Sequence, residues 1–312
     1  MQRKALVTGG AGFIGSHLVD RLLAAGEEVV VLDDLSSGRA DNLPPQVRLV
    51  RGDVCDADLL GRLLAGVDCI FHLAARVSVQ LCISDWMGAH RVNLGGTIAV
   101  LHAAHRAGNI PVVHASSAAI YGNRAGATCR ETDLPLPISP YAADKLAAEH
   151  QAAAMAEVHG LPSVGLRFFN VYGPRQDAAS PYAGVISKFC ANRLADRPQV
   201  IFGDGQQSRD FICVADVVEG LLRARDLAGQ APGAQVFNLC TGTETTLLEL
   251  VRQIDAIAGR GASAIEHAPA RSGDIRASCG CPQAARDRLG FAAATDMRSG
   301  LDRLWDALVA AG

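Results

Sequence analysis

The sequence predicts an α/β protein in which a doubly wound parallel sheet is followed by a smaller C-terminal α/β lobe. Short apolar runs alternate with helical patterns through the first half of the chain, which is typical of βαβ units. A glycine-rich turn joins the first apolar run to the first helical pattern, as in sheets of the Rossmann type. After residue 170 the alternation gives way to loops rich in Gly, Pro and Ser. These observations predict two lobes, in keeping with a length of 312 residues.

The expected elements follow one another in a regular order. Apolar runs predict strands at residues 5–7, 29–32, 47–51, 69–73, 112–115 and 163–169, and helical patterns lie between them at 14–25, 57–64, 91–107 and 140–159. Right-handed crossovers place these helices on both faces of one sheet. Returning strands are expected at 210–215 and 236–239, and further helices at 246–258 and 297–310.

The composition argues against several classes of protein. Hydrophobic residues make up 49% of the chain and charged residues 20%, which favours a large buried core over disorder. The net charge is −3 without a cluster of Lys or Arg, and no apolar run has the length of a membrane helix. We therefore expect neither a nucleic-acid nor a membrane partner. The nine scattered cysteines favour small buried residues in a reducing cytoplasm, and the spacing of Cys279 and Cys281 is not that of a zinc site, so we expect no metal.

The glycine-rich turn predicts a dinucleotide-phosphate site. Gly10, Gly12 and Gly15 satisfy the pattern G-x-G-x-x-G, and Gly9, Gly12 and Gly15 satisfy G-x-x-G-x-x-G. Such glycines allow a tight turn, a close approach of backbone to the pyrophosphate and close packing of the next helix on the sheet. The positive end of that helix would point at the phosphates. Taken alone, the motif is also compatible with an ordinary strand-to-helix turn.

An acidic residue at the end of the second expected strand points to NAD. Asp33 follows the apolar run 29–32, about 20 residues after the glycines, where a carboxylate accepts from the ribose hydroxyls of the dinucleotide. A carboxylate there repels the 2′-phosphate of NADP. Asp34 is adjacent, and the cation Arg39 lies beyond the turn at 36–38. A simple strand cap is the alternative role for Asp33.

Tyr141 and Lys145 form a candidate acid–base pair. Ser139 and Pro140 are a good N-cap and first residue for a helix, and a spacing of four puts the phenol and the ammonium on one face. The lysine charge is expected to lower the pKa of the phenol toward neutrality. Ser117 ends an apolar strand at the sheet edge where such folds bind ligands. A surface helix pair is the alternative for the tyrosine and lysine alone.

With these motifs the chain resembles the extended short-chain dehydrogenase/reductases, and among them the NAD-dependent sugar-nucleotide epimerase/dehydratase group, most of all UDP-hexose and UDP-N-acetylhexosamine 4-epimerases. The resemblance covers nearly the whole chain. Its further marks are Gly52-Asp53-Val54, His72-Leu73-Ala74-Ala75, Asn93 before Gly95-Gly96-Thr97, the stretches 116–122 and 167–176, Ser208-Arg209-Asp210-Phe211 and Arg271-Ser272-Gly273-Asp274.

The resemblance implies a role for each site residue. Ser117, Tyr141 and Lys145 would be catalytic. The implied cofactor contacts are Gly9, Gly12, Phe13, Ile14, Gly15, Asp33, Asp34, Ser37, Gly38, Asp53, Val54, Leu73, Ala74, Ala75, Asn93, Ala115, Tyr141, Lys145 and Phe169. The implied substrate contacts are Ser117, Tyr141, Asn170, Phe202, Arg209, Arg271, Asp274 and Ser278. Residues 1–170 with about 210–242 would bind NAD, and residues 171–209 and 243–312 the UDP-sugar.

The implied substrate contacts suit a nucleoside diphosphate. Asn170, Arg209 and Arg271 would hold the diphosphate, since guanidinium groups match phosphate geometry. Asp274 would bind the uridine ribose, and Phe202 would stack near the uracil. A surface ion pair is the alternative role for each of the two arginines.

The resemblance also implies the reaction. Tyr141 would take the proton of the sugar O4 while a hydride leaves C4 for NAD, which gives a 4-ketose. Dehydratases of the group then use an Asp-Glu pair after the strand hydroxyl, and decarboxylases a Glu, whereas this chain has Ala118 and Ala119. C4 epimerisation is therefore expected. A dehydratase and a non-catalytic NAD-binding regulator are weaker alternatives.

The expected sugar and assembly rest on a few positions. The resemblance places Ser278 at a position where hexose 4-epimerases restricted to Glc and Gal carry a tyrosine, which implies UDP-GlcNAc and UDP-GalNAc as substrates beside UDP-Glc and UDP-Gal. Asp177 follows Gln176 where uronate epimerases often carry an Arg, although Arg76 or Arg175 is available for a uronate or another modified sugar. Apolar residues on several faces of helices 91–107 and 140–159 favour a homodimer.

Overall fold

A computed structural model describes residues 2–124, 126–177, 184–230, 232–270 and 275–311. Its larger lobe is a seven-stranded sheet of order β10-β6-β5-β4-β1-β2-β3, in which every neighbouring pair is parallel. The strands are β1 (Lys4–Thr8), β2 (Glu28–Asp33), β3 (Arg48–Arg51), β4 (Cys69–His72), β5 (Val112–Ser117), β6 (Ser163–Phe168) and β10 (Ala234–Leu239). The chain order reverses between β1 and β4, and the carboxyl edge at such a point is where doubly wound sheets bind ligands.

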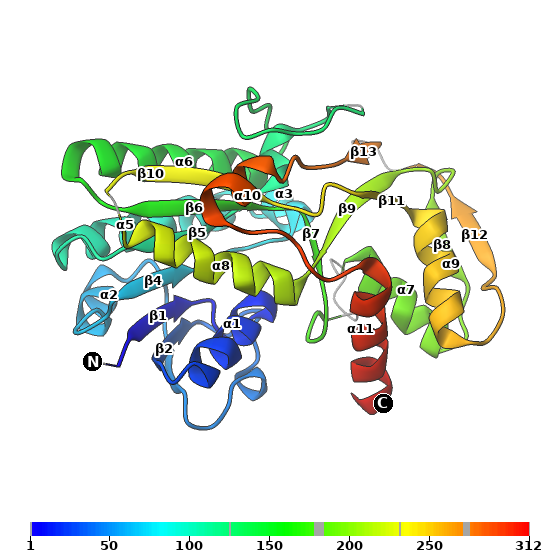
Figure 1. Cartoon of the computed structure of the whole chain (residues 1–312), viewed down its shortest axis with the longest axis horizontal. Helices are drawn as coiled ribbons and strands as arrows, with labels where there is room; N and C mark the ends of the chain where they lie inside the picture. Colours follow the sequence, from blue (N-terminus) through cyan, green and yellow to red (C-terminus); the bar gives the residue numbers. More distant parts are fainter. Residues whose placement is uncertain (1, 125, 178–183, 231, 271–274, 312) are drawn as a thin grey trace.

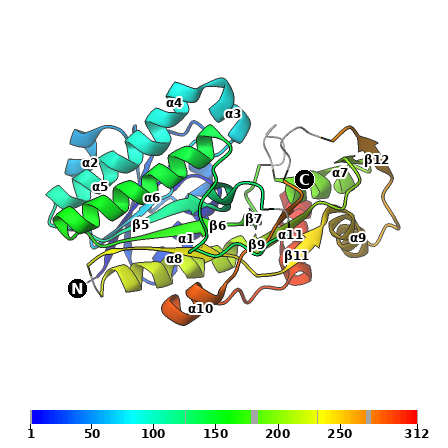
Figure 2. The same ribbon diagram turned by 90° about the horizontal axis from the view of Figure 1, so that it is seen from above.

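Helices cover both faces of this sheet (Figures 1 and 2). One face carries α1 (Phe13–Ala24), α8 (Val214–Ala228) and α10 (Gln283–Leu289), and the other α2 (Ala57–Leu63), α5 (Gly96–Arg106) and α6 (Pro140–His159). Neighbouring residues of β1 point to opposite faces of the sheet. Val7 packs in the core beneath α1, α8 and α10, and Leu6 packs in the core beneath α2, α5 and α6; both side chains are fully buried. The strands therefore read as continuous apolar runs. The predicted fold class is confirmed.

The helix expected at 91–107 is wrong in its bounds and its form. The helical path begins earlier, with α3 (Val79–Ser84) and α4 (Trp86–His90), and continues through a π-helical turn at Arg91–Gly95 before α5 begins at Gly96. The side chain of Asn93 in this turn binds the backbone of Arg76, and the Thr97 hydroxyl donates to the Asn93 carbonyl at 2.7 Å. These bonds favour the wider turn, a form that is frequent at functional sites.

The smaller lobe has its own sheets and core, on the right of Figure 1. In its four-stranded sheet, β9 (Ser208–Cys213) lies between β11 (Glu244–Thr246) and β13 (Ala277–Ser278), and β7 (Asn170–Tyr172) also pairs with β9. A second sheet joins β8 (Gln199–Phe202) to β12 (Ile265–Ala268). The helices are α7 (Val185–Leu194), α9 (Leu247–Ala258) and α11 (Met297–Ala311).

The chain passes between the lobes several times. The strand expected at 210–215 is β9 and lies in the small sheet, whereas the one expected at 236–239 is β10, at the edge of the large sheet. Which lobe binds the cofactor and which binds the substrate stays a prediction. Among the described helices, none is long and apolar enough to cross a membrane.

Candidate active site

The turn between β1 and α1 requires glycine at several positions and leaves helix N–H groups without a side-chain cap. Gly9 has φ +71°, and a Cβ added to it would lie 2.6 Å from the Ala74 backbone nitrogen, while one added to Gly15 would collide with the Gly9 carbonyl oxygen. Gly12 is the N-cap of α1 and offers no side-chain cap. The first N–H groups of this helix are thus left for another acceptor, and an anion at a helix N-terminus suits them. This cradle fits the pyrophosphate of a dinucleotide.

Asp33 ties this turn to β2. Its buried carboxylate accepts hydrogen bonds from the Ala11 and Leu35 backbone N–H groups, both at 2.9 Å, and burial raises its pKa. A Cβ on Gly38 would lie 3.0 Å from the same carboxylate, so the turn after β2 closes tightly over it. Asp33 therefore holds the loop in place through these two hydrogen bonds. Its predicted contact with the ribose hydroxyls would use the remaining lone pairs of the same carboxylate. Asp34 is engaged by the Ser36 N–H.

Other expected cofactor residues surround this edge. Asp53 accepts from the Cys55 N–H at 2.9 Å and forms an ion pair with Arg91, and the buried Val54 side chain packs where Gly96 has no Cβ. The Leu73 N–H donates to the Thr8 carbonyl at 3.0 Å, which places 73–75 beside the glycine turn. Asn93 is buried and engages the backbone of Arg76 through both its amide atoms, at 2.8 and 3.2 Å. The cofactor contacts of these residues stay predictions.

Sequence reasoning missed a buried hydrogen-bond chain behind the turn. The Thr97 hydroxyl donates to a carbonyl, so it accepts from His72 Nε2, 3.1 Å away, and His72 Nδ1 then accepts from the Thr8 hydroxyl at 2.8 Å. Burial lowers the pKa of His72 to about 3, which keeps the ring neutral. These hydrogen bonds connect β1, β4 and α5. A histidine inside an otherwise apolar strand run was the available signal.

The structure brings Ser117, Tyr141 and Lys145 together. Ser117 ends β5, and Tyr141 and Lys145 lie one turn apart on α6, which begins with the Ser139 cap and Pro140. Lys145 Nζ donates to the Ala115 carbonyl at 2.8 Å and lies 5.9 Å from the centroid of the Tyr141 ring. The three side chains are thus positioned by two rigid elements of the large lobe.

The expectation that Lys145 lowers the pKa of the Tyr141 phenol is wrong for the protein without cofactor. Burial raises the pKa of Tyr141 to about 12, and the hydrogen bond to Ser117 opposes that rise. Burial also lowers the pKa of Lys145 to about 8. Desolvation is therefore the largest influence on the pKa of both groups. A phenolate here needs a further positive charge nearby.

The expected substrate residues divide between described and undescribed parts of the chain. Arg209 on β9 and Ser278 on β13 are partners in register, and Asn170 on β7 is the partner of Phe211 on the other side of β9. Phe202 ends β8 in the adjoining sheet. Phe169 is buried in a cluster with Tyr121, Cys129 and Cys240. Arg271 and Asp274 lie outside the described residues.

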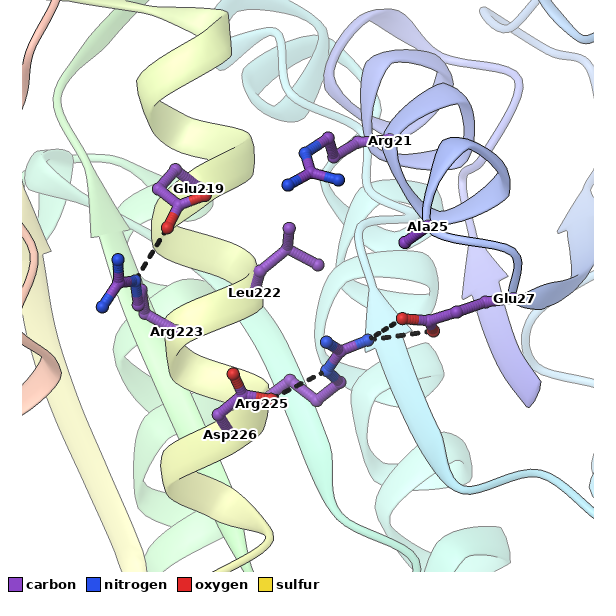
Figure 3. Close-up of a pocket in the computed structure, with 8 residues that line it drawn as sticks. All are labelled: Arg21, Ala25, Glu27, Glu219, Leu222, Arg223, Arg225 and Asp226. Carbon is purple, nitrogen blue, oxygen red and sulfur yellow. Dashed lines mark hydrogen bonds and ion pairs between the residues drawn. The ribbon is translucent and has the colours of Figure 1, made fainter. Parts of the chain in front are cut away.

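The two arginines considered for a uronate are engaged by carboxylates. Arg76 pairs with Asp85 at 3.5 Å and Arg175 with Asp20 at 2.7 Å. The nine cysteines are free thiols, of which seven are buried. A hollow of about 290 Å³ lies between α1 and α8 (Figure 3), where Arg225 pairs with Glu27 and Arg223 with Glu219. It involves the last turn of α1, whereas the glycine cradle is at the first, so we assign it no part in the site.

Comparison with known proteins gives the same picture. The chain matches the model of the NAD dependent epimerase/dehydratase family over residues 5–240. It is 44% identical to a UDP-glucose 4-epimerase of Mycolicibacterium smegmatis over 92% of this chain and 93% of that protein. A dTDP-glucose 4,6-dehydratase of Streptomyces niveus is 36% identical over 96% of this chain and 90% of that protein.

A solved structure matches this chain along its whole length. The UDP-N-acetylglucosamine 4-epimerase of Methanobrevibacter ruminantium, in complex with UDP-N-acetylmuramic acid, has a TM-score of 0.94 and 33% identity, covering 100% of this chain and 99% of that one. Together these matches confirm the resemblance and NAD as the cofactor.

Proposed function

Because this chain belongs to the NAD-dependent epimerase/dehydratase family, we propose that it is an enzyme that interconverts the C4 epimers of a UDP-sugar. The observation that carries the proposal is the grouping of Ser117, Tyr141 and Lys145 at the carboxyl end of β5, on the same sheet edge as the glycine turn that follows β1. Bound NAD supplies the hydride acceptor and, in its oxidised form, a positive ring.

Each of the three side chains has a defined task in this proposal. The Ser117 hydroxyl holds the sugar O4, and the Tyr141 phenol takes the O4 proton as the C4 hydride departs. Since burial raises the pKa of Tyr141 to about 12, the proton acceptor forms only when positive charge is present beside it. Lys145 supplies part of that charge and is anchored by the Ala115 carbonyl. Tyr141 would then return the proton to O4, and epimerisation would be complete once C4 has taken its hydride back on the other face.

The residues after Ser117 favour epimerisation over dehydration. Ala118 and Ala119 open a short helical turn directly after the strand, so the positions next to the reacting hydroxyl carry methyl groups. A methyl group cannot move the proton that elimination of water across C5 and C6 requires. Dehydration stays the alternative reaction, because the Streptomyces relative is a dehydratase. In this chain, another group would have to move that proton.

The register of the small sheet supports a proposal for the substrate class. Ser278 is a small, half-buried residue opposite Arg209 in register, so the arginine proposed for the diphosphate and the serine proposed beside the sugar C2 lie on neighbouring strands. We propose UDP-GlcNAc/UDP-GalNAc, together with UDP-Glc/UDP-Gal, as substrates. A uronate is less suited, because Arg76 and Arg175 are already engaged by carboxylates.

A substrate panel tests this proposal. Purified protein is incubated without added cofactor with UDP-Glc, UDP-Gal, UDP-GlcNAc, UDP-GalNAc and UDP-glucuronate, and products are followed by ¹H NMR. We expect interconversion within the acetylated pair and no net change in redox state. A 4-keto-6-deoxy product would assign the dehydratase activity instead, and no conversion of any member would refute the proposal.

We further propose a cytoplasmic homodimer. The nine free cysteines suit a reducing compartment. Ile83, Trp86 and Met87, on the neighbouring helices α3 and α4, are more than half exposed, which is unusual for large apolar side chains that have no partner to cover them. Sedimentation velocity should give a dimer for the wild type and a monomer for Met87→Glu. A monomeric wild type would contradict the assembly.

A further inference from the structure

A buried carboxylate lies on β9 directly after the arginine proposed for the diphosphate. Asp210 follows Arg209 and is fully buried. Its Oδ1 accepts from the backbone N–H and the hydroxyl of Thr241, at 2.8 and 2.7 Å. Its Oδ2 accepts from the backbone N–H groups of Gly242 and Gly280, at 2.9 and 3.3 Å. All four of these groups are donors, so Asp210 takes part as an ionised carboxylate.

These hydrogen bonds join three segments that are distant in the sequence. The turn at 241–242 follows β10 of the large sheet, β9 belongs to the small sheet, and Gly280 follows β13. The chain at Gly280 approaches its neighbours closely, because an added Cβ would lie 2.6 Å from both the Cys240 Sγ and the Phe169 ring. Asp210 therefore holds the backbone after β13 against the turn that follows β10.

The position of Ser278 depends on the register of a very short strand. β13 has two residues, and Ser278 is the partner of Arg209 at the end of its ladder with β9. Because side chains alternate along a strand, Arg209 and Ser278 share one face and Asp210 lies on the other. Cys279 points to the face of Asp210, with its Sγ 3.9 Å from Oδ2. A slip of β13 by one residue would turn Ser278 away from Arg209.

We propose that Asp210 is a positioning residue for substrate binding, which holds Gly280 and thereby keeps Ser278 in register beside Arg209. The hydrogen bond to Gly280 extends the link between β13 and β9 beyond their last paired residues. The effect on the substrate rests on the proposed function, in which Arg209 and Ser278 contact the diphosphate and the sugar. Loss of the carboxylate should therefore weaken binding of the UDP-sugar and spare both NAD binding and the chemical step.

Asp210→Ala tests the proposal because it removes both acceptor oxygens. We expect the dissociation constant for UDP-GlcNAc, measured by calorimetric titration, to rise about tenfold, near the lower end of what one hydrogen bond to a charged group contributes. KM should rise in parallel, while kcat and the dissociation constant for NAD stay within about twofold of the wild type. Asp210→Asn keeps one acceptor oxygen and should restore part of the affinity. Should Asp210→Ala not fold, a smaller rise in Asp210→Asn is the expected result.

The matched control is Asp216→Ala. Asp216 on α8 is also a buried carboxylate, and it accepts from the backbone N–H groups of Ala294 and Thr295 at 3.2 and 3.1 Å. It thus ties down a segment that carries no proposed substrate contact. The variant should lower the midpoint of urea denaturation and leave the dissociation constant for UDP-GlcNAc unchanged. An equal rise in both alanine variants would reflect general destabilisation and overturn the proposal, as would unchanged affinity in Asp210→Ala and Asp210→Asn.

Hydrogen exchange measures the anchoring of the chain directly. The peptide that covers residues 276–282 should exchange faster in Asp210→Ala than in the wild type, and at the wild-type rate in Asp216→Ala. Unchanged exchange at this peptide in Asp210→Ala would overturn the proposal. A wild type that binds UDP-GlcNAc without converting it would refute the proposed function, and the dissociation constants would still decide the role of Asp210.

Discussion

Arg167 on β6 and Glu149 on α6 form a buried two-pronged ion pair, with Nε to Oε1 at 2.9 Å and Nη2 to Oε2 at 2.7 Å. Glu149 lies two turns beyond Tyr141 and one beyond Lys145, so it belongs to the same face of α6. It also accepts from the Ser116 hydroxyl at 2.5 Å, next to Ser117 on β5. The pair therefore fixes the rotation of α6 against the two strands that the active residues face.

Breaking this pair should be costly. Glu149→Gln leaves the Arg167 guanidinium buried without its full partner, and we expect the free energy of unfolding to fall by about 3–5 kcal/mol. Glu219→Gln breaks an exposed pair of similar length, 2.7 Å to Arg223, and should cost less than about 1 kcal/mol. Urea denaturation of both variants measures this. Equal losses would show that the buried pair has no special weight.

Tyr141→Phe should remove turnover and spare binding. The change deletes the proton acceptor while keeping the ring, so kcat should fall by about 10²–10⁴-fold. Calorimetric titration should give NAD and UDP affinities close to those of the wild type. A phenylalanine variant with a nearly normal kcat would mean that another group takes the proton.

Ser278→Tyr should change substrate preference. A ring beside Arg209 would fill the space proposed for the C2 acetamido group, so the clash falls on the acetylated sugar alone. The ratio of kcat/KM for UDP-GlcNAc over UDP-Glc should drop, while Ser278→Ala should leave that ratio unchanged. If the tyrosine variant keeps the wild-type ratio, Ser278 does not line the C2 pocket.

NAD affinity should weaken above about pH 8. Burial lowers the pKa of Lys145 to about 8, so the ammonium is present below that pH and is lost as the pH rises through it. If the ammonium helps to hold the cofactor, the dissociation constant should be flat below this point and increase above it. Lys145→Met should bind NAD more weakly with no inflection there. An inflection that persists in Lys145→Met would assign it to another group.

The sequence predicted the large sheet well because the signals there are local. Apolar runs, the glycine turn and the Ser139–Pro140 helix start each depend on neighbouring residues, and these are the elements that the structure reproduces. The π-helical turn at Arg91–Gly95 depends instead on bonds from Asn93 to a distant loop. The pKa of Tyr141 depends on how many atoms bury it, which no spacing reveals.

The sheet of the small lobe was harder to predict, because its strand pairs join distant parts of the chain. The strand expected at 210–215 had an ordinary apolar pattern, but its partners β7, β11 and β13 come from three separate parts of the chain. The ion pair of Glu149 with Arg167 and the contact of Asp144 with His90 are likewise long-range and carried no motif.

The most direct test of the central claim follows the hydrogen at C4. UDP-sugar deuterated at C4 is converted in ordinary water, and the deuterium content of the product is measured by NMR and mass spectrometry. Transfer of hydride from C4 to bound NAD and back predicts that the epimer keeps its deuterium at C4. Loss of the deuterium to solvent would contradict the account, since it would mean that C4 is epimerised by proton exchange rather than by oxidation.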